Sequence, residues 1–146
     1  MASVEEHNKQ VVGRFFEFYN AHDIESMGHL ISSSNYSFQF PGMPPMDWNG
    51  HKQFIVGIIR AFPDFHRNVT DVVAERDKVA VRFNITGTHK GELQDIPPTG
   101  KQVSLEGTEF FTIVDGKILE EWVIVDMIGL LQQVGAIPAG SSTARL

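Results

Sequence analysis

Three titratable side chains in the C-terminal half of the chain are candidates for proton transfer: Asp126, Glu109 and His89. Asp126 interrupts the apolar run VIVDMIGLLQQVG at residues 123–135, where a charge is costly unless it has partners or a task. Apolar surroundings raise the pKa of a carboxyl group, and a second carboxylate nearby, such as Glu109, raises it further. One such group can both accept and return a proton when its pKa lies within reach of neutrality. The three residues are therefore candidates for acid/base chemistry.

The same three residues also have structural explanations. Asp126 directly precedes an expected helix, and aspartate is a favoured N-cap residue whose loss typically costs ~1 kcal/mol. A capping position favours the anion and lowers the pKa, which opposes a role as general acid. Glu109 fits a solvent-facing strand position, and His89, which is followed by Lys90 and Gly91, fits a surface turn.

A hairpin turn allows the facing of these residues to be predicted. The sequence VDGK at residues 114–117 contains Asp-Gly, the strongest short-range hairpin signal. If Val114 opposes Lys117, Glu109 faces Trp122 and Leu105 faces Asp126. Side chains alternate with period two, so one face is expected to carry Asp126, Trp122, Ile124, Glu109 and Phe111. The other face is no more polar, so hydrophobicity does not determine which face of the sheet is concave. An earlier turn at residues 76–77 would place His89 near Asp64.

The apolar periodicity predicts helices first and strands afterwards. Ser3 and Glu6 form a capping box for a helix that ends near residues 20–22, Asp23 caps a short helix over 24–31, and Asn49 caps a helix that stops at Pro63. The predicted strands are 35–40, 66–75, 78–89, 101–114 and 117–126, and a last helix covers 127–134. The proline-rich segment 41–50 is expected to be a loop that acts as a flap.

This order predicts an α+β domain with the helices packed on one face of a curved antiparallel sheet. A pocket between sheet and helices is the usual ligand site. The residues expected to contact a ligand are Trp122, Phe111, Ile124, Phe40, Phe16 and Tyr19. We expect one domain over residues 1–138 and a flexible tail over 139–146.

Composition excludes several classes of function. The net charge is −6 and the 12 Lys and Arg are scattered, so nucleic-acid binding is not expected. No apolar stretch has the length of a membrane span and the start does not resemble a signal peptide, so a cytoplasmic protein is predicted. There is no cysteine, no His-Glu-x-x-His and no Gly-x-Ser-x-Gly, so we predict no metal site and no hydrolase nucleophile of that type.

Several segments together resemble one known family. These are AFPD at 61–64, GTHKGE at 87–92, IPPTGK at 96–101, DGKILEEW at 115–122, and Asp126 followed by GLLQQVG. Over nearly the whole chain the sequence resembles the SnoaL-like polyketide cyclases, also called ester cyclases, of the nuclear transport factor 2-like superfamily.

The resemblance implies a cone-shaped, cystatin-like α+β barrel with a deep apolar cavity, a homodimer formed through the sheet, and no cofactor. It implies that an acidic cavity residue acts as general acid/base in an intramolecular aldol ring closure, a role that we assign to Asp126. Glu109 stands where relatives often have histidine, and Trp122 and His89 match cavity-lining positions.

Three hypotheses about function follow. The first is a cyclase-like enzyme that acts on a small apolar carbonyl compound. The second is a non-catalytic cavity protein that binds an apolar metabolite, with Asp126 as helix cap and polar anchor. The third is another reaction on the same fold, as in ketosteroid isomerase-like or epoxide hydrolase-like relatives, in which Glu109 and Asp126 form an acidic pair.

Overall fold

The computed structural model describes residues 2–139. The elements in chain order are α1 (Val4–Asn20), α2 (Ile24–Gly28), β1 (Ser37–Gln39), α3 (Trp48–Ala61), β2 (His66–Glu75), β3 (Lys78–Thr88), β4 (Gln102–Val114), β5 (Lys117–Val125) and α4 (Met127–Gln133). The four long strands and the helix order match the predicted pattern. The predicted tail at 139–146 lies, apart from its first residue, outside the described residues.

Side-chain caps fix where the helices begin. The Ser3 hydroxyl accepts a hydrogen bond from the Glu6 backbone N–H at 3.1 Å, and Asp23 caps α2 by accepting from the Ser26 N–H at 3.1 Å. Asp47, not Asn49, caps α3, because its carboxylate accepts from the Gly50 N–H at 2.8 Å. The prediction for the start of this helix was therefore wrong by two positions.

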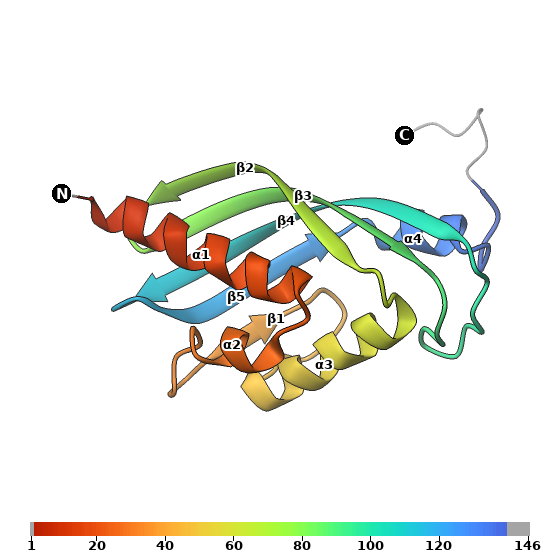
Figure 1. Ribbon diagram of the computed structural model, residues 1–146, viewed down its shortest axis with the longest axis horizontal. Helices are drawn as coiled ribbons and strands as arrows, with labels where there is room; N and C mark the ends of the chain where they lie inside the picture. Colours follow the sequence, from red (N-terminus) through yellow and green to blue (C-terminus); the bar gives the residue numbers. More distant parts are fainter. Residues whose placement is uncertain (1, 140–146) are drawn as a thin grey trace.

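The strands form one five-stranded, curved and unclosed sheet in the order β1-β5-β4-β3-β2. Neighbouring strands are antiparallel except for the short β1, which pairs with β5 in parallel. Figure 1 shows the long strands arching over α1, α2 and α3, which all lie on the same side of the sheet. The predicted α+β class is confirmed, and the parallel edge strand is the feature that the sequence pattern did not indicate.

A β-bulge changes the register of the β4–β5 hairpin. The turn forms as predicted, with Val114 opposite Lys117 and Ile113 opposite Ile118. The register then shifts by one residue, so Glu109 lies opposite Val123 instead of Trp122. Because side chains alternate across a sheet, this shift exchanges the two faces of β5 relative to β4.

A second bulge affects the β2–β3 hairpin, with a shift between Val69 and Asp71. It places Thr88, not His89, beside Asp64. The Asp64 carboxylate accepts hydrogen bonds from the Thr88 backbone N–H at 2.6 Å and from its hydroxyl at 2.7 Å. The predicted proximity of His89 and Asp64 was wrong for this reason.

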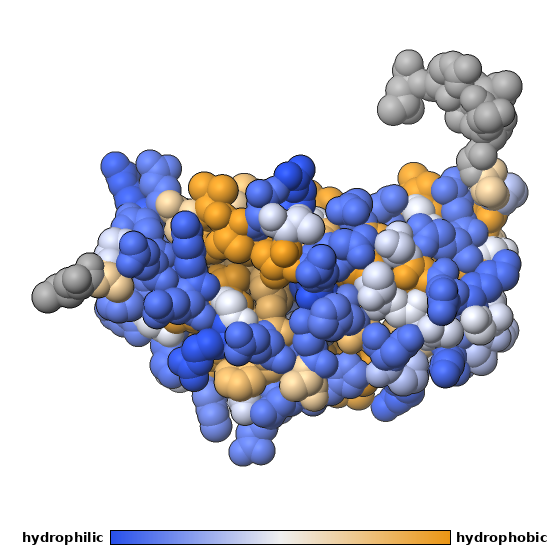
Figure 2. Space-filling model, turned by 45° about the horizontal axis from the view of Figure 1, so that its top comes forward, coloured by the Kyte–Doolittle hydropathy of each residue, from blue (hydrophilic) through white to orange (hydrophobic). Residues whose placement is uncertain are grey.

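Aromatic rings from α1 and the sheet fill the core. The Phe16 ring lies 5.6 Å from that of Phe111 and 6.3 Å from that of Phe83, measured between centroids. Gly107 permits this packing, because a Cβ at this position would lie 2.6 Å from the Phe83 ring. The outer face of the sheet is different, since Phe110, Trp122 and Ile124 are all more than half exposed there. Figure 2 shows apolar surface between hydrophilic side chains on the side of the molecule that it views.

Candidate active site

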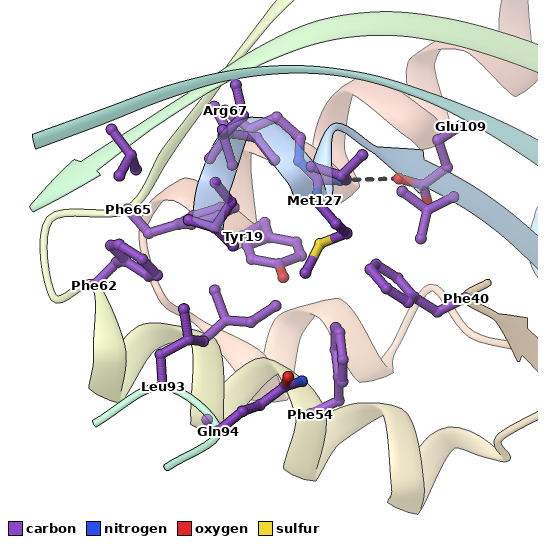
Figure 3. Close-up of a pocket in the computed structure, with 18 of the residues that line it drawn as sticks. Tyr19, Phe40, Phe54, Phe62, Phe65, Arg67, Leu93, Gln94, Glu109 and Met127 are labelled. Atoms are coloured by element: carbon purple, nitrogen blue, oxygen red, sulfur yellow. Dashed lines mark hydrogen bonds and ion pairs between the residues drawn. The ribbon is translucent and has the colours of Figure 1, made fainter. Parts of the chain in front are cut away.

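A cavity of about 290 Å³ lies between the concave face of the sheet and the helices. This is close to the lower end of the roughly 300–1,000 Å³ typical of small-molecule sites. Its walls are mostly apolar, with aromatic rings of α3 and neighbouring segments such as Phe54, Phe62 and Phe65. Figure 3 shows these rings around the space, with Leu93, Gln94 and Met127 also bordering it.

A buried ion pair lies in the cavity wall. Arg67 Nη1 donates to Glu109 Oε1 at 2.9 Å, and the two side chains are 7% and 1% exposed. The Asn20 side chain holds the backbone of Arg67, accepting from its N–H at 2.8 Å and donating to its carbonyl at 2.9 Å. The guanidinium carbon lies 4.3 Å from the Phe83 ring centroid and 4.8 Å from that of Tyr19, which favours the cation by cation–π attraction.

A second buried polar group joins β5, α3 and the residue just before β1. The Tyr36 hydroxyl donates to Glu121 Oε2 on β5 and lies 2.7 Å from His51 Nδ1 on α3. His51 Nδ1 is 3.7 Å from Glu121 Oε2, and the His51 ring stacks on Phe38 with centroids 3.7 Å apart. Glu121 and His51 line the cavity and are 1% and 2% exposed.

The electrostatics of the site favour one proton on the carboxylate pair. Burial raises the pKa of Glu121 well above its ordinary value, and the charge of Glu109 and a hydrogen bond with it raise it further. The hydrogen bond from Tyr36 and the charge of Arg67 oppose this effect. Burial, followed by the charge of Arg67, lowers the pKa of His51 to about 3. The positive charge of Arg67 therefore offsets that of Glu109, and burial favours the uncharged forms of Glu121 and His51.

The three residues predicted to be catalytic lie in different places. Glu109 lines the cavity as expected. Asp126 is exposed, is absent from the cavity lining among the described residues, and caps α4 by accepting from the Gly129 N–H at 2.8 Å. The prediction that it faces the cavity was wrong, because the bulge shifts the pairing of β5 by one residue and the assumed register no longer holds at Asp126.

His89 is fully buried, but it is not among the described residues that line the cavity. Its Nδ1 lies 3.0 Å from the Thr99 hydroxyl, the Thr99 backbone N–H donates to it at 3.3 Å, and its ring packs against Phe62. The structure therefore shows His89 holding together the two ends of the loop between β3 and β4. It is neither the predicted surface residue nor a wall of the cavity.

The predicted ligand contacts divide into three groups. Phe40 and Tyr19 line the cavity. Phe111 and Phe16 are buried in the core and do not belong to the lining. Trp122 and Ile124 project from the outer face, 51% and 60% exposed, because of the register shift in β5.

Sequence reasoning missed the residues that form the polar part of the site: Arg67, Tyr36, His51 and Glu121. A regular register of the hairpin would place Glu121 on the face opposite to Glu109. The bulge in β5, which the sequence pattern did not indicate, brings Glu121 to the cavity side. Arg67 sits in a strand among Val and Thr residues, where a buried cation has no local signal. His51 lies on the apolar side of α3 and reads as an ordinary core histidine.

Within residues 2–139, no three His, Asp or Glu side chains gather closely enough to hold a metal ion. No helix in that range is both long and apolar enough to cross a membrane.

Comparisons with known proteins agree with this geometry. Residues 9–134 match the family model described as SnoaL-like polyketide cyclase. AclR from Streptomyces galilaeus, a proposed hydroxylase, is 28% identical with a TM-score of 0.86, over 94% of this chain and 87% of its own. IdmH from Streptomyces antibioticus, a proposed polyketide cyclase, is 28% identical with a TM-score of 0.77, over 88% of this chain and 98% of its own. A SnoaL-like protein from Jannaschia, 21% identical with a TM-score of 0.86 over 94% and 98%, shares the fold. No curated protein matches significantly in sequence.

Proposed function

The chain belongs to the SnoaL-like polyketide cyclase family, and from this premise we propose that it is a cofactor-independent enzyme that closes a ring in a small, largely apolar carbonyl compound by an aldol-type reaction. The observation that carries the proposal is the pair of buried carboxyl groups, Glu109 and Glu121, on the wall of one apolar cavity with a single arginine. Pairs of titratable groups whose surroundings push their pKa values apart commonly divide acid and base roles.

The chemistry assigns different tasks to the two carboxyl groups. An aldol closure removes a proton from a carbon next to a carbonyl and adds one to the oxygen of the attacked carbonyl. Protonated Glu121 is the donor to the oxygen of the carbonyl that enolises as its neighbouring carbon loses the proton, since burial raises its pKa and favours the protonated form. Arg67 holds Glu109 as the charged member, so the pair retains one proton. A positioned acid of this kind contributes about 10²–10⁴-fold to a rate.

The cavity also supports a preference for apolar ligands. Aromatic and aliphatic side chains make up most of its wall, and the ion pair of Arg67 and Glu109 forms, with the Glu121 carboxyl, a polar end on the strands. A ligand is expected to place its reacting carbonyl at this polar end and its hydrocarbon part against the rings.

A second candidate function is double-bond isomerisation of an enone. It is favoured by the protonated carboxyl of Glu121, because such a group can donate a hydrogen bond to a dienolate oxygen, as in ketosteroid isomerase. If no proton transfer is found, the protein is a non-catalytic binding protein for an apolar metabolite.

Two variants test the proposed function. The purified protein is offered a panel of aromatic β-keto esters and conjugated enones, and products are followed by absorbance and mass spectrometry. We expect Glu121→Gln to lower the turnover of any accepted compound by at least about a hundredfold, with ligand affinity changed only a few-fold. The matched control is Glu106→Gln, which changes an exposed carboxylate on the outer face of β4. Turnover that survives Glu121→Gln would refute the role of this residue.

A further inference from the structure

The hydrogen bond that Tyr36 donates to Glu121 indicates the tautomer of His51. A tyrosine hydroxyl carries one hydrogen, and that of Tyr36 is donated to Glu121 Oε2. Its contact with His51 Nδ1 at 2.7 Å then requires His51 to donate, so Nδ1 carries the imidazole hydrogen. Neutral His51 therefore has an unprotonated Nε2, and a continuous chain of donors runs from His51 through Tyr36 to Glu121.

Both ends of this chain belong to the cavity, whereas its middle does not. His51 and Glu121 are among the lining residues, and Tyr36, 8% exposed, is not. Because Nδ1 is engaged by Tyr36, the ring nitrogen that His51 has left for a ligand is Nε2. The cavity wall thus presents a free base and, on another element, an acid that is linked to it through a buried hydroxyl.

We propose that His51 is a second catalytic residue, the base of the reaction, and that Tyr36 relays protons between it and Glu121. This inference rests on the proposed function, because it supplies the proton acceptor that the ring closure requires. Glu109 is the less suitable acceptor, since its Oε1 is already engaged by Arg67 at 2.9 Å. The ligand class is an enolisable ketone or β-dicarbonyl compound, which has both a C–H acid and an oxygen to be protonated.

The proton balance closes within the site. As the substrate C–H bond breaks, its proton passes to His51 Nε2, and the Nδ1 hydrogen of His51 passes to the Tyr36 oxygen. The Tyr36 hydrogen then passes to Glu121 Oε2. The proton that Glu121 carried at the start passes to the oxygen of the carbonyl next to the reacting carbon. The substrate becomes an enol, and no group gains or loses net charge. When the enol attacks the second carbonyl, the protons move back: the enol hydrogen returns to Glu121, and His51 Nε2 supplies the new alcohol. The site is then restored.

The surroundings favour a relay over a separate histidine base. Burial and the charge of Arg67 lower the pKa of His51 to about 3, so an imidazolium is costly. A relay avoids this cost because each group receives one proton as it loses another. The ring is also held in place, with Phe38 stacked on it at 3.7 Å and the edge of Trp48 packed against it.

Nitrogen NMR of the histidines tests the relay without a substrate. Nitrogen-15 chemical shifts distinguish the two neutral tautomers, and the His51 signal is assigned by its loss in His51→Gln. We expect the Nδ1–H tautomer in the wild-type protein and a shifted Nδ1 signal in Tyr36→Phe. An Nε2–H tautomer in the wild-type protein would overturn the proposal, whatever the activity of the enzyme.

Deuterium exchange into ethyl benzoylacetate, at the carbon between its two carbonyls, tests the relay in action. We expect Tyr36→Phe to slow the enzyme-catalysed exchange by about a hundredfold, as His51→Gln and Glu121→Gln do. The control is Trp48→Phe, which alters the packing on Tyr36 and His51 but removes no relay group and should change the rate less than about threefold. Exchange at the wild-type rate in Tyr36→Phe, with Glu121→Gln inactive, would refute the relay but leave the proposed function intact. If wild-type protein gives no exchange, the proposed function fails on this probe, and the tautomer measurement still decides the relay.

Discussion

Arg67→Met is expected to destabilise the fold strongly, because it leaves the carboxylate of Glu109 buried without its partner. Glu109 is 1% exposed and its Oε1 receives the 2.9 Å hydrogen bond from Arg67. Removing one member of a buried ion pair typically costs about 3–5 kcal/mol, and methionine keeps much of the side-chain volume beside Phe83 and Tyr19. The expected loss in the free energy of unfolding is therefore about 3–5 kcal/mol, of which the uncompensated charge is the main part.

An exposed ion pair in the same sheet provides the control. Arg82 and Asp71 form a salt bridge with side chains 64% and 53% exposed, so Arg82→Met should cost no more than about 1 kcal/mol. The double variant Arg67→Met with Glu109→Gln leaves no buried charge, and we expect it to recover about 1–3 kcal/mol relative to the sum of the two single changes. Urea denaturation followed by circular dichroism measures each free energy of unfolding. Equal losses for Arg67→Met and Arg82→Met, or a double-mutant cycle without coupling, would refute the electrostatic account of the site.

Three further predictions concern the pH response, the helix cap and the oligomeric state. The pKa of Glu121 is raised in the folded state, so its burial costs nothing below its unfolded pKa and destabilises the fold increasingly as pH rises above that value. Urea denaturation across this range should show Glu121→Gln gaining stability relative to wild type, and parallel profiles would contradict the shift. Asp126→Ala should lower the free energy of unfolding by ~1 kcal/mol, because it removes the α4 cap, and should leave turnover unchanged. Lost turnover in a folded variant would show that Asp126 takes part in the reaction. We also propose that a second copy covers the exposed Phe110, Trp122 and Ile124, so that Ile124→Glu shifts a dimer to monomer in sedimentation velocity, whereas a wild-type monomer would exclude this assembly.

The elements of the fold could be predicted because their signals are local. The segment 66–75 was predicted as a strand and is β2 (His66–Glu75). The Asp-Gly turn formed with positive φ at both residues, 52° for Asp115 and 76° for Gly116, as a primed turn requires. Alternating β-branched residues, capping side chains and prolines act within a few positions, so the sequence alone displays them.

The candidate site could not be predicted to the same extent, because it depends on single-residue offsets between strands. One unpaired position in β5, between Ile118 and Glu120, moves Glu121 into the cavity and Trp122 out of it. Nothing in the residues at the bulge distinguishes it from a regular ladder. The contacts of Arg67 and His51 likewise join segments far apart in the chain, and they emerge only when the elements pack.

The protonation state of Glu121 is the most direct test of the account. Infrared spectroscopy at neutral pH should show the carbonyl stretch of a protonated, buried carboxyl group that shifts in deuterium oxide and disappears in Glu121→Gln. A spectrum identical in wild type and Glu121→Gln in that region would mean that Glu121 is ionised, and both the proposed acid and its relay would be lost.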